Sequence, residues 1–211
     1  MTRRDFITGS MLGAAGVGQG FSPASTRRGP GISPAPVVAL RLTGTPGRVG
    51  AALALDEMAR TASLLGRTVA VRDGPDAIAI DLDGGSLTVN NRPYFVTASA
   101  AARDQALARW RRGGTNTAKA AVEWHGRLTK YGAEQLNARF ARRFRYEMDA
   151  AAWIAWMLVK IAVESRLRSE PVASGRYDGH KGAPLTFSAD RRLIQPLCIV
   201  SAAGDLLGVA E

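Results

Sequence analysis

Short apolar runs alternate with helix-length stripes of apolar residues from residue 37 onward. The run VVALRL at residues 37–42 predicts a strand, and TVAV at residues 68–71 predicts a second one. Between them, apolar residues recur at steps of three and four on one helix face: Ala52, Leu55, Met58, Ala62 and Leu65. Gly66 can end this helix in the left-handed conformation. The order strand, helix, strand predicts a parallel pair of strands joined by a crossover helix.

The same alternation continues toward the end of the chain. Further strands are predicted at residues 77–82, 93–97, 120–124, 185–187 and 197–200. Further helices are predicted at residues 99–112, 133–146 and 150–168. Ser99 and Asp149 stand where their side chains can cap the first and the last of these helices. The pattern predicts an α/β domain over residues 37–211, with a parallel sheet and flanking helices.

The first residues have the pattern of an export signal. Arg3 and Arg4 are adjacent, the bulky pair Phe6–Ile7 follows, and residues 11–17 form a weakly hydrophobic run rich in glycine and alanine. That run is too short and too rich in glycine to cross about 30 Å of hydrocarbon. We interpret residues 1–25 as a twin-arginine export signal and expect a periplasmic protein. Residues 26–36 contain proline, glycine and serine without periodicity, which predicts a linker.

The composition is that of a folded domain without a metal centre. The chain has 211 residues, of which 46% are hydrophobic and 22% charged, enough for one compact domain after removal of the signal. Cys198 is the single cysteine, so no internal disulfide can form, and its apolar neighbours predict a buried side chain. His125 and His180 are the two histidines, which argues against structural zinc. We expect no metal and no cofactor.

The net charge of +10 raises the alternative of a nucleic-acid or polyanion binder. The densest basic cluster, Arg139 to Arg145, lies on a predicted helix that also carries aromatic residues. Leu136, Phe140 and Phe144 nevertheless follow each other at intervals of four, which is the spacing of a core-facing stripe. The arginines then occupy the solvated faces of that helix. We therefore favour a helix packed on the domain and expect no nucleic-acid partner.

No catalytic motif stands out. The turn at residues 43–47 lies between a strand and a helix, as phosphate-binding loops do, but it lacks both the Gly-Lys-Ser/Thr ending and the GxGxxG spacing. No G-x-S-x-G segment supports a serine nucleophile. Asp81 and Asp83 are interpreted as a strand end and turn. These observations predict a protein that is not an enzyme.

Several longer segments resemble one family. The segment VGAALALDEMARTASLLGRTVAV (residues 49–71) is similar to the first helix and second strand of leucine-type substrate-binding proteins of ABC transporters. RPYFVTASAAARDQALARW (residues 92–110) resembles the passage where that family's chain crosses between its two lobes, and DAAAWIAWMLVKIAVESRLR (residues 149–168) resembles a late helix. The segment from Trp124 to Phe140 and the ends of residues 184–196 resemble members associated with alcohol oxidation dependent on pyrroloquinoline quinone.

The resemblance implies a periplasmic-binding-protein type I fold, with two α/β lobes hinged around a ligand cleft. This chain is much shorter than the family's members, so we expect about one lobe, with most of the second missing. The implied function is an exported solute-binding component of an ABC transport system, or an accessory to a quinoprotein alcohol dehydrogenase. The implied partners are an amino acid, alcohol or small acid, an ABC permease, and a quinoprotein dehydrogenase. The alternatives are an interaction protein that uses a degenerate single lobe, and a polyanion binder that uses the helix with Arg139 to Arg145.

Candidate ligand-binding residues follow from the positions of the predicted strand ends. In open α/β sheets, ligands bind outside the carboxyl ends of the strands. Small polar or aromatic residues stand at three such ends in this sequence: Thr43, Thr97, Ser99, Trp124 and His125. Their hydroxyl and backbone N–H groups could hold a carboxylate or an alcohol, and the indole could form an apolar wall.

Overall fold

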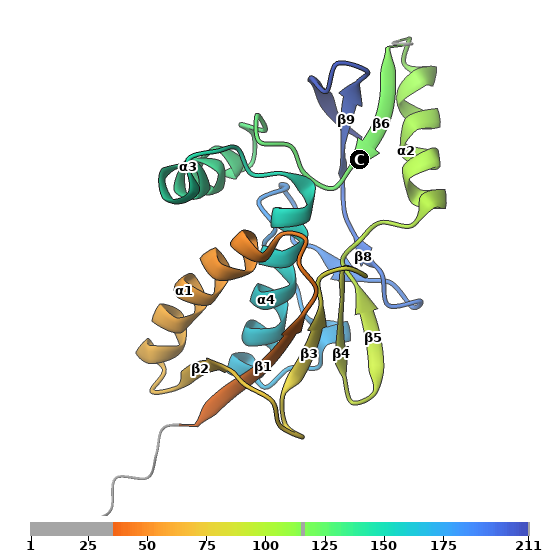
Figure 1. Ribbon diagram of the computed structural model, residues 1–211. Helices are drawn as coiled ribbons and strands as arrows, with labels where there is room; N and C mark the ends of the chain where they lie inside the picture. Colours follow the sequence, from red (N-terminus) through yellow and green to blue (C-terminus); the bar gives the residue numbers. More distant parts are fainter. Residues whose placement is uncertain (1–35, 115–116, 211) are drawn as a thin grey trace, which may run out of the picture. The chain divides into compact units, whose positions relative to one another are not determined.

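The computed structural model describes residues 36–114 and 117–210 (Figure 1). The export signal predicted at residues 1–25, and the predicted linker apart from Pro36, lie outside the described residues. The described chain is a mixed α/β structure with flanking helices, so the α/β class predicted from the sequence is confirmed.

The largest sheet has five strands in the order β2-β1-β3-β4-β5 within the described residues. Its strands are β1 (Val37–Thr43), β2 (Thr68–Val71), β3 (Ile78–Asp81), β4 (Ser86–Val89) and β5 (Arg92–Phe95). β1 pairs in parallel with β2 and with β3, as predicted, whereas β3, β4 and β5 pair antiparallel. The expectation of a parallel sheet is therefore wrong for half of the sheet.

A tight hairpin accounts for the antiparallel pairing of β4 with β5. β4 and β5 are joined by Asn90 and Asn91, whose φ angles are 51° and 59°. Two consecutive residues with positive φ form the two-residue turn whose twist matches that of paired antiparallel strands, and asparagine tolerates this conformation better than most residues. The turn sends the chain straight back along the sheet, so no crossover helix fits between these strands.

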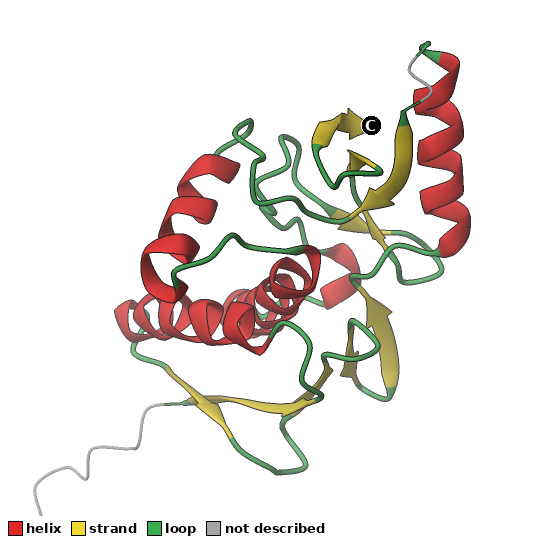
Figure 2. Ribbon diagram, turned by 45° about the horizontal axis from the view of Figure 1, so that its top comes forward, coloured by secondary structure: helices red, strands yellow, loops and turns green. Residues whose placement is uncertain are grey.

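Two long helices cover one face of this sheet, α1 (Arg48–Leu64) and α4 (Ala150–Arg168) (Figures 1 and 2). The alternation in β3 fits this arrangement, because Ile78 and Ile80 are buried and Asp81 is exposed. α4 begins after Asp149, whose side chain accepts a hydrogen bond from the Ala152 N–H at 2.7 Å, so the predicted cap is confirmed. The buried face of α1 includes Met58 and Ala62, as predicted, but contains Leu53 and Ala54 in place of Ala52 and Leu55. Leu65, just after the helix, is 59% exposed.

A second, three-stranded sheet has the order β10-β9-β6 and is antiparallel (Figure 1). Its strands are β6 (Ala118–Val122), β9 (Leu197–Ser201) and β10 (Leu206–Ala210). The helix α2 (Ala100–Arg112) packs on these strands and shares a small separate core with them. The described chain passes between the two sheets three times: between β5 and α2, after β6, and just before β9.

The remaining elements lie around the large sheet. The helix α3 (Ala133–Phe144) contacts α1 and buries Leu136 and Phe140, as predicted from their spacing. After α4 come the short helix η1 (Val172–Ser174) and the strands β7 (Thr186–Phe187) and β8 (Leu193–Ile194), which pair with each other. Arg192, just before β8, forms a bridge with Phe95, so this segment covers the outer edge of β5.

Candidate functional site

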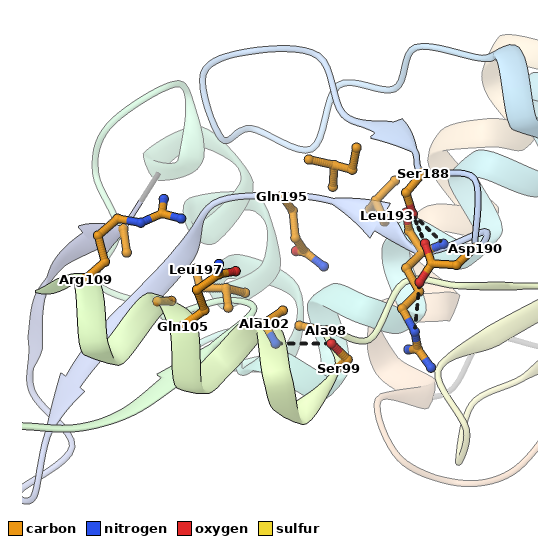
Figure 3. Close-up of a pocket in the computed structure, with 14 residues that line it drawn as sticks. Ala98, Ser99, Ala102, Gln105, Arg109, Ser188, Asp190, Leu193, Gln195 and Leu197 are labelled. Carbon is orange, nitrogen blue, oxygen red and sulfur yellow. Dashed lines mark hydrogen bonds and ion pairs between the residues drawn. The ribbon is translucent and has the colours of Figure 1, made fainter.

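A cleft with a volume of about 340 Å³ lies between α2 and the segment from Ser188 to Leu197 (Figure 3). This volume is in the range of cavities that hold small ligands. Both connections that enter the second sheet reach the cleft, the first through Ala98 and Ser99 and the last through Gln195. The polar side chains that line it come from two segments far apart in sequence: Ser99, Gln105, Arg109, Ser188, Asp190, Arg192 and Gln195.

One face of α2 forms the first wall of the cleft. Ser99 caps the helix, because its Oγ accepts a hydrogen bond from the Ala102 N–H at 3.2 Å. Gln105 and Arg109 follow at helical spacing on the same face. The first turn of α2 has no acidic residue, and the Glu123 carboxylate, which accepts from the Ala98 N–H at 2.8 Å, lies beside the start of the helix.

The turn from Ser188 to Arg192 forms the opposite wall. The Ser188 Oγ is held by the Arg192 backbone, from whose N–H it accepts a hydrogen bond at 3.2 Å, and Arg191 has a φ of 60°. The same hydroxyl hydrogen-bonds Asp190 and so lowers the pKa of that carboxyl below its usual value. The Arg192 guanidinium stacks over Phe95 at 4.6 Å and donates to the Thr97 carbonyl at 3.4 Å. The turn is thereby tied to the first connection.

Hydrogen bonds between the connections hold the floor of the cleft. Gln195 Nε2 donates to the Val96 carbonyl at 2.6 Å, which joins the last connection to the first. Glu123 lies on the middle connection and is only 2% exposed. Its carboxylate accepts from the Ala98 N–H at 2.8 Å and from the Arg103 guanidinium at 2.6 Å. A buried carboxylate paired in this way fixes the local backbone, and the partner that it bonds, Ala98, itself lines the cleft.

The charges of the cleft favour an anion. Arg109 and Arg192 contribute two guanidinium groups, and Asp190 contributes one carboxylate, 3.8 Å from Arg192. Asp190 is largely exposed, so water screens its charge. The Gln105 amide offers both donors and acceptors, whereas the Gln195 amide, which Figure 3 shows extending toward α2, already bonds Val96 and Lys181. This arrangement suits a small molecule with a carboxylate and a neighbouring polar group.

The structure brings few of the predicted ligand-binding residues to this cleft. Ser99 lines it, and Thr97 lies beside it with its carbonyl bonded to Arg192. Thr43 lies at the end of β1, where its hydroxyl donates to the Ile80 carbonyl at 3.3 Å. Thr43 therefore completes a strand end, away from the residues that form the cleft.

Trp124 and His125 have structural contacts instead. Trp124 is 1% exposed, stacks on Trp153 with ring centroids 5.7 Å apart, and donates from Nε1 to Asn137 at 2.9 Å. A side chain this deeply buried cannot form a wall for a ligand, so that expectation is corrected. His125 Nε2 lies 2.8 Å from the Gly204 carbonyl, and its Nδ1 accepts from the Arg127 N–H at 3.1 Å.

The polar side chains that sequence reasoning missed are Gln105, Arg109, Ser188, Asp190, Arg192 and Gln195. A signal was present on α2, because Ser99, Gln105 and Arg109 share one face of a predicted helix. Nothing in the sequence placed that face opposite residues 188–197. The chain after α4 brings residues 188–197 opposite α2, and only the tertiary structure shows this.

Two further searches bear on the kinds of site present. Among residues 36–114 and 117–210, no group of three or more His, Cys, Asp or Glu side chains could hold a metal ion. In the same part of the chain, no helix is both long and apolar enough to cross a membrane.

Comparison with known proteins does not assign a family. No protein-family model matches the chain, and no similar curated protein and no similar solved structure was found. The function must therefore be argued from the cleft and from the segments of the sequence that resemble substrate-binding proteins.

Proposed function

We propose that this protein is an exported solute-binding component of an ABC transport system and that its cleft binds a small carboxylic acid. The observation that carries the proposal is the cleft itself, where two guanidinium groups, two amides and a helix N-terminus surround a volume of about 340 Å³. Position adds support, because solute-binding proteins of the resembled family bind ligands where the chain crosses between two lobes.

The three connections also support the proposal of a reduced two-lobed protein. The first sheet with α1 and α4 corresponds to one lobe, and the antiparallel sheet with α2 to a remnant of the second. One wall of the cleft comes from α2, and the other comes from the segment from Ser188 to Gln195, which covers the edge of β5 in the first sheet. A ligand would thus contact two walls, although the second wall is small.

The binding test compares two arginines of the same helix. Calorimetry against amino acids, aromatic acids and short alcohols should find binding of an acid with a dissociation constant in the micromolar to millimolar range, or about −4 to −8 kcal/mol. Arg109→Gln should weaken this binding by about tenfold or more, because it removes a charged donor from the cleft. Arg112→Gln is the matched control, because Arg112 is exposed on α2 and does not line the cleft. Equal effects of the two variants, or binding of alcohols alone, would contradict the proposal.

Export is tested separately, because Arg3 and Arg4 lie outside the described residues. Lysine at both positions keeps the charge and removes the guanidinium pair that the twin-arginine route recognises. We expect this double variant to stay in the cytoplasm, as measured by cell fractionation and immunoblotting. The control replaces Arg27 and Arg28 with lysine, since this second arginine pair lies beyond the predicted signal. Normal periplasmic yield of the first variant would show that the segment is not such a signal.

A second candidate function, an interaction protein, is favoured by one exposed apolar surface. Leu64 and Leu65 at the end of α1 are 86% and 59% exposed, and Val71 on the edge strand β2 is 54% exposed. Such a surface can contact a permease or a dehydrogenase. Serine at both leucines should abolish capture of the permease in a pull-down while ligand binding in the cleft stays unchanged.

The polyanion alternative is weakened by the contacts of α3. Arg139 pairs with Glu57 at 2.8 Å, and Arg143 pairs with Asp56, so two of the four clustered arginines are neutralised by α1. The pairs fasten α3 to α1 and leave Arg142 and Arg145 exposed. Two solvated arginines release few counterions from a polyanion.

A further inference from the structure

A second cavity, of about 550 Å³, lies beside the cleft and shares Ile194 and Gln195 with it as a common wall. Half of its other lining residues are apolar and come from one loop, residues 182–185. A single basic residue, Lys181, belongs to the lining among the described residues. The cavity therefore differs in chemistry from the cleft, which is lined by charged and amide groups.

The amine of Lys181 is deeply buried in the wall of this cavity. The residue is only 3% exposed, and Nζ donates to Gln195 Oε1 and to the Pro196 carbonyl, both at 2.8 Å. Lys181, Gln195 and Pro196 all line the cavity, so the residues that hold the amine form part of its wall. Nζ lies 4.1 Å from the centre of the Trp153 ring, which covers another side. Two acceptors and one aromatic face thus fix the orientation of the amine.

This environment makes the amine a nucleophile near neutral pH. Burial lowers the pKa of Lys181 to about 7, because the protonated form loses its hydration. The titratable groups that face it, Cys198 and Glu123, act in the opposite direction and do not cancel this effect. A lysine exposed to water keeps a pKa of about 10.4 and is almost wholly protonated at pH 7. A neutral amine has the free electron pair that attack on carbon requires.

We propose that this cavity is a binding site for a small apolar carbonyl compound, an aldehyde or a ketone, which condenses with Lys181. The Nζ electron pair forms a bond to the carbonyl carbon, and the carbonyl oxygen takes up a proton to give a carbinolamine. Loss of the former carbonyl oxygen as water then leaves a C=N bond to Nζ. Both hydrogens of the water come from the amine, so the reaction needs no oxidant or reductant. The proposal does not require that the neighbouring cleft binds an acid, although the two sites share Gln195.

The four lysines of the chain provide an internal comparison for the test. The full protein is incubated at pH 7 with benzaldehyde and sodium cyanoborohydride, which reduces an imine to a stable amine, and each lysine is scored by peptide mass spectrometry. We expect Lys181 to react at least about tenfold faster than the exposed Lys119 and Lys130, because a much larger fraction of it is unprotonated. The preference should shrink toward pH 9. Reaction of Lys181 no faster than that of the exposed lysines, or only after addition of urea, would overturn the proposal.

A second variant tests whether the cavity is the route to the amine. Ala183→Trp places a large side chain at the cavity lining without altering Lys181, and Ala173→Trp is an exposed control outside the cavity. If thermal melting shows that both are folded, the first should slow labelling of Lys181 by about tenfold or more and leave Lys119 and Lys130 unchanged. Equal labelling of Lys181 in the two variants would exclude binding in this cavity.

Discussion

Replacing Trp153 with alanine is expected to destabilise the protein by about 3 to 5 kcal/mol, as deletions of large buried aromatic side chains do. The indole is fully buried in the main core, and its ring lies nearly parallel to that of Trp124, at an angle of 7°. Its Nε1 donates to the Gly179 carbonyl at 3.2 Å, and that carbonyl would lose its partner. The change thus leaves a cavity and an unpaired polar group in one place.

Denaturant unfolding monitored by circular dichroism measures this loss. Tyr146→Ala is a suitable control, because Tyr146 is also aromatic and contacts Phe140 but is 49% exposed. It should cost no more than about 1 kcal/mol. A loss below about 1 kcal/mol for Trp153→Ala would contradict the described core and would make the indole a candidate for partner contact.

The stability of the protein should rise between pH 7 and pH 9 because of Lys181. Its pKa is about 7 in the folded chain and near the ordinary lysine value of 10.5 in the unfolded chain. In this interval the unfolded chain binds a proton that the folded chain has released, so the free energy of unfolding increases with pH. Two pH units correspond to at most about 2.7 kcal/mol from this group. Burial also raises the pKa values of Cys198 and Tyr177. The unfolded chain loses these two protons at a lower pH than the folded chain does, so both groups lower the free energy of unfolding at high pH and limit the rise due to Lys181.

The measurement is the free energy of unfolding at several pH values for three proteins. Lys181→Met removes the titrating group and should abolish the rise, whereas Lys119→Met, at an exposed lysine of the second sheet, should keep it. If the free energy of unfolding changes with pH in the same way for all three proteins between pH 7 and pH 9, Lys181 titrates normally in the folded state.

Local sequence signals were sufficient for the helices. The helix predicted at residues 150–168 is observed at Ala150–Arg168, because a capping aspartate precedes an uninterrupted run of helix-forming residues. The hairpin was missed, although Asn90 and Asn91 are a typical two-residue turn, because no strand was predicted at residues 86–89, where β4 lies. β8 and β10 were also missed; a two-residue strand and a strand interrupted by glycine give little periodicity.

The candidate site was harder to predict than the fold. Reasoning from strand ends found Ser99 and the neighbouring Thr97, because both follow β5 directly. The same reasoning failed for Trp124. The position of this residue at a strand end does not reveal that Trp153 of α4 packs against its indole. Arg109 and Arg192 are separated by nearly half of the described part of the chain, and arginines are frequent throughout this sequence. To place both arginines in one cleft, one must know that residues 188–197 lie opposite α2.

The contact between α1 and α4 places a limit on how this sequence can vary. A Cβ atom on Gly50 would lie 1.8 Å from the Ala152 carbonyl oxygen, and one on Gly47 would lie 2.1 Å from that of Ala151. Gly47 also has a φ of 69°. Two backbones this close admit no side chain between them, whatever the surrounding residues become. Distant relatives of this chain should therefore be recognisable by a G-x-x-G pattern at the start of the first helix, facing small residues in the first turn of the late helix, even where their other residues have diverged.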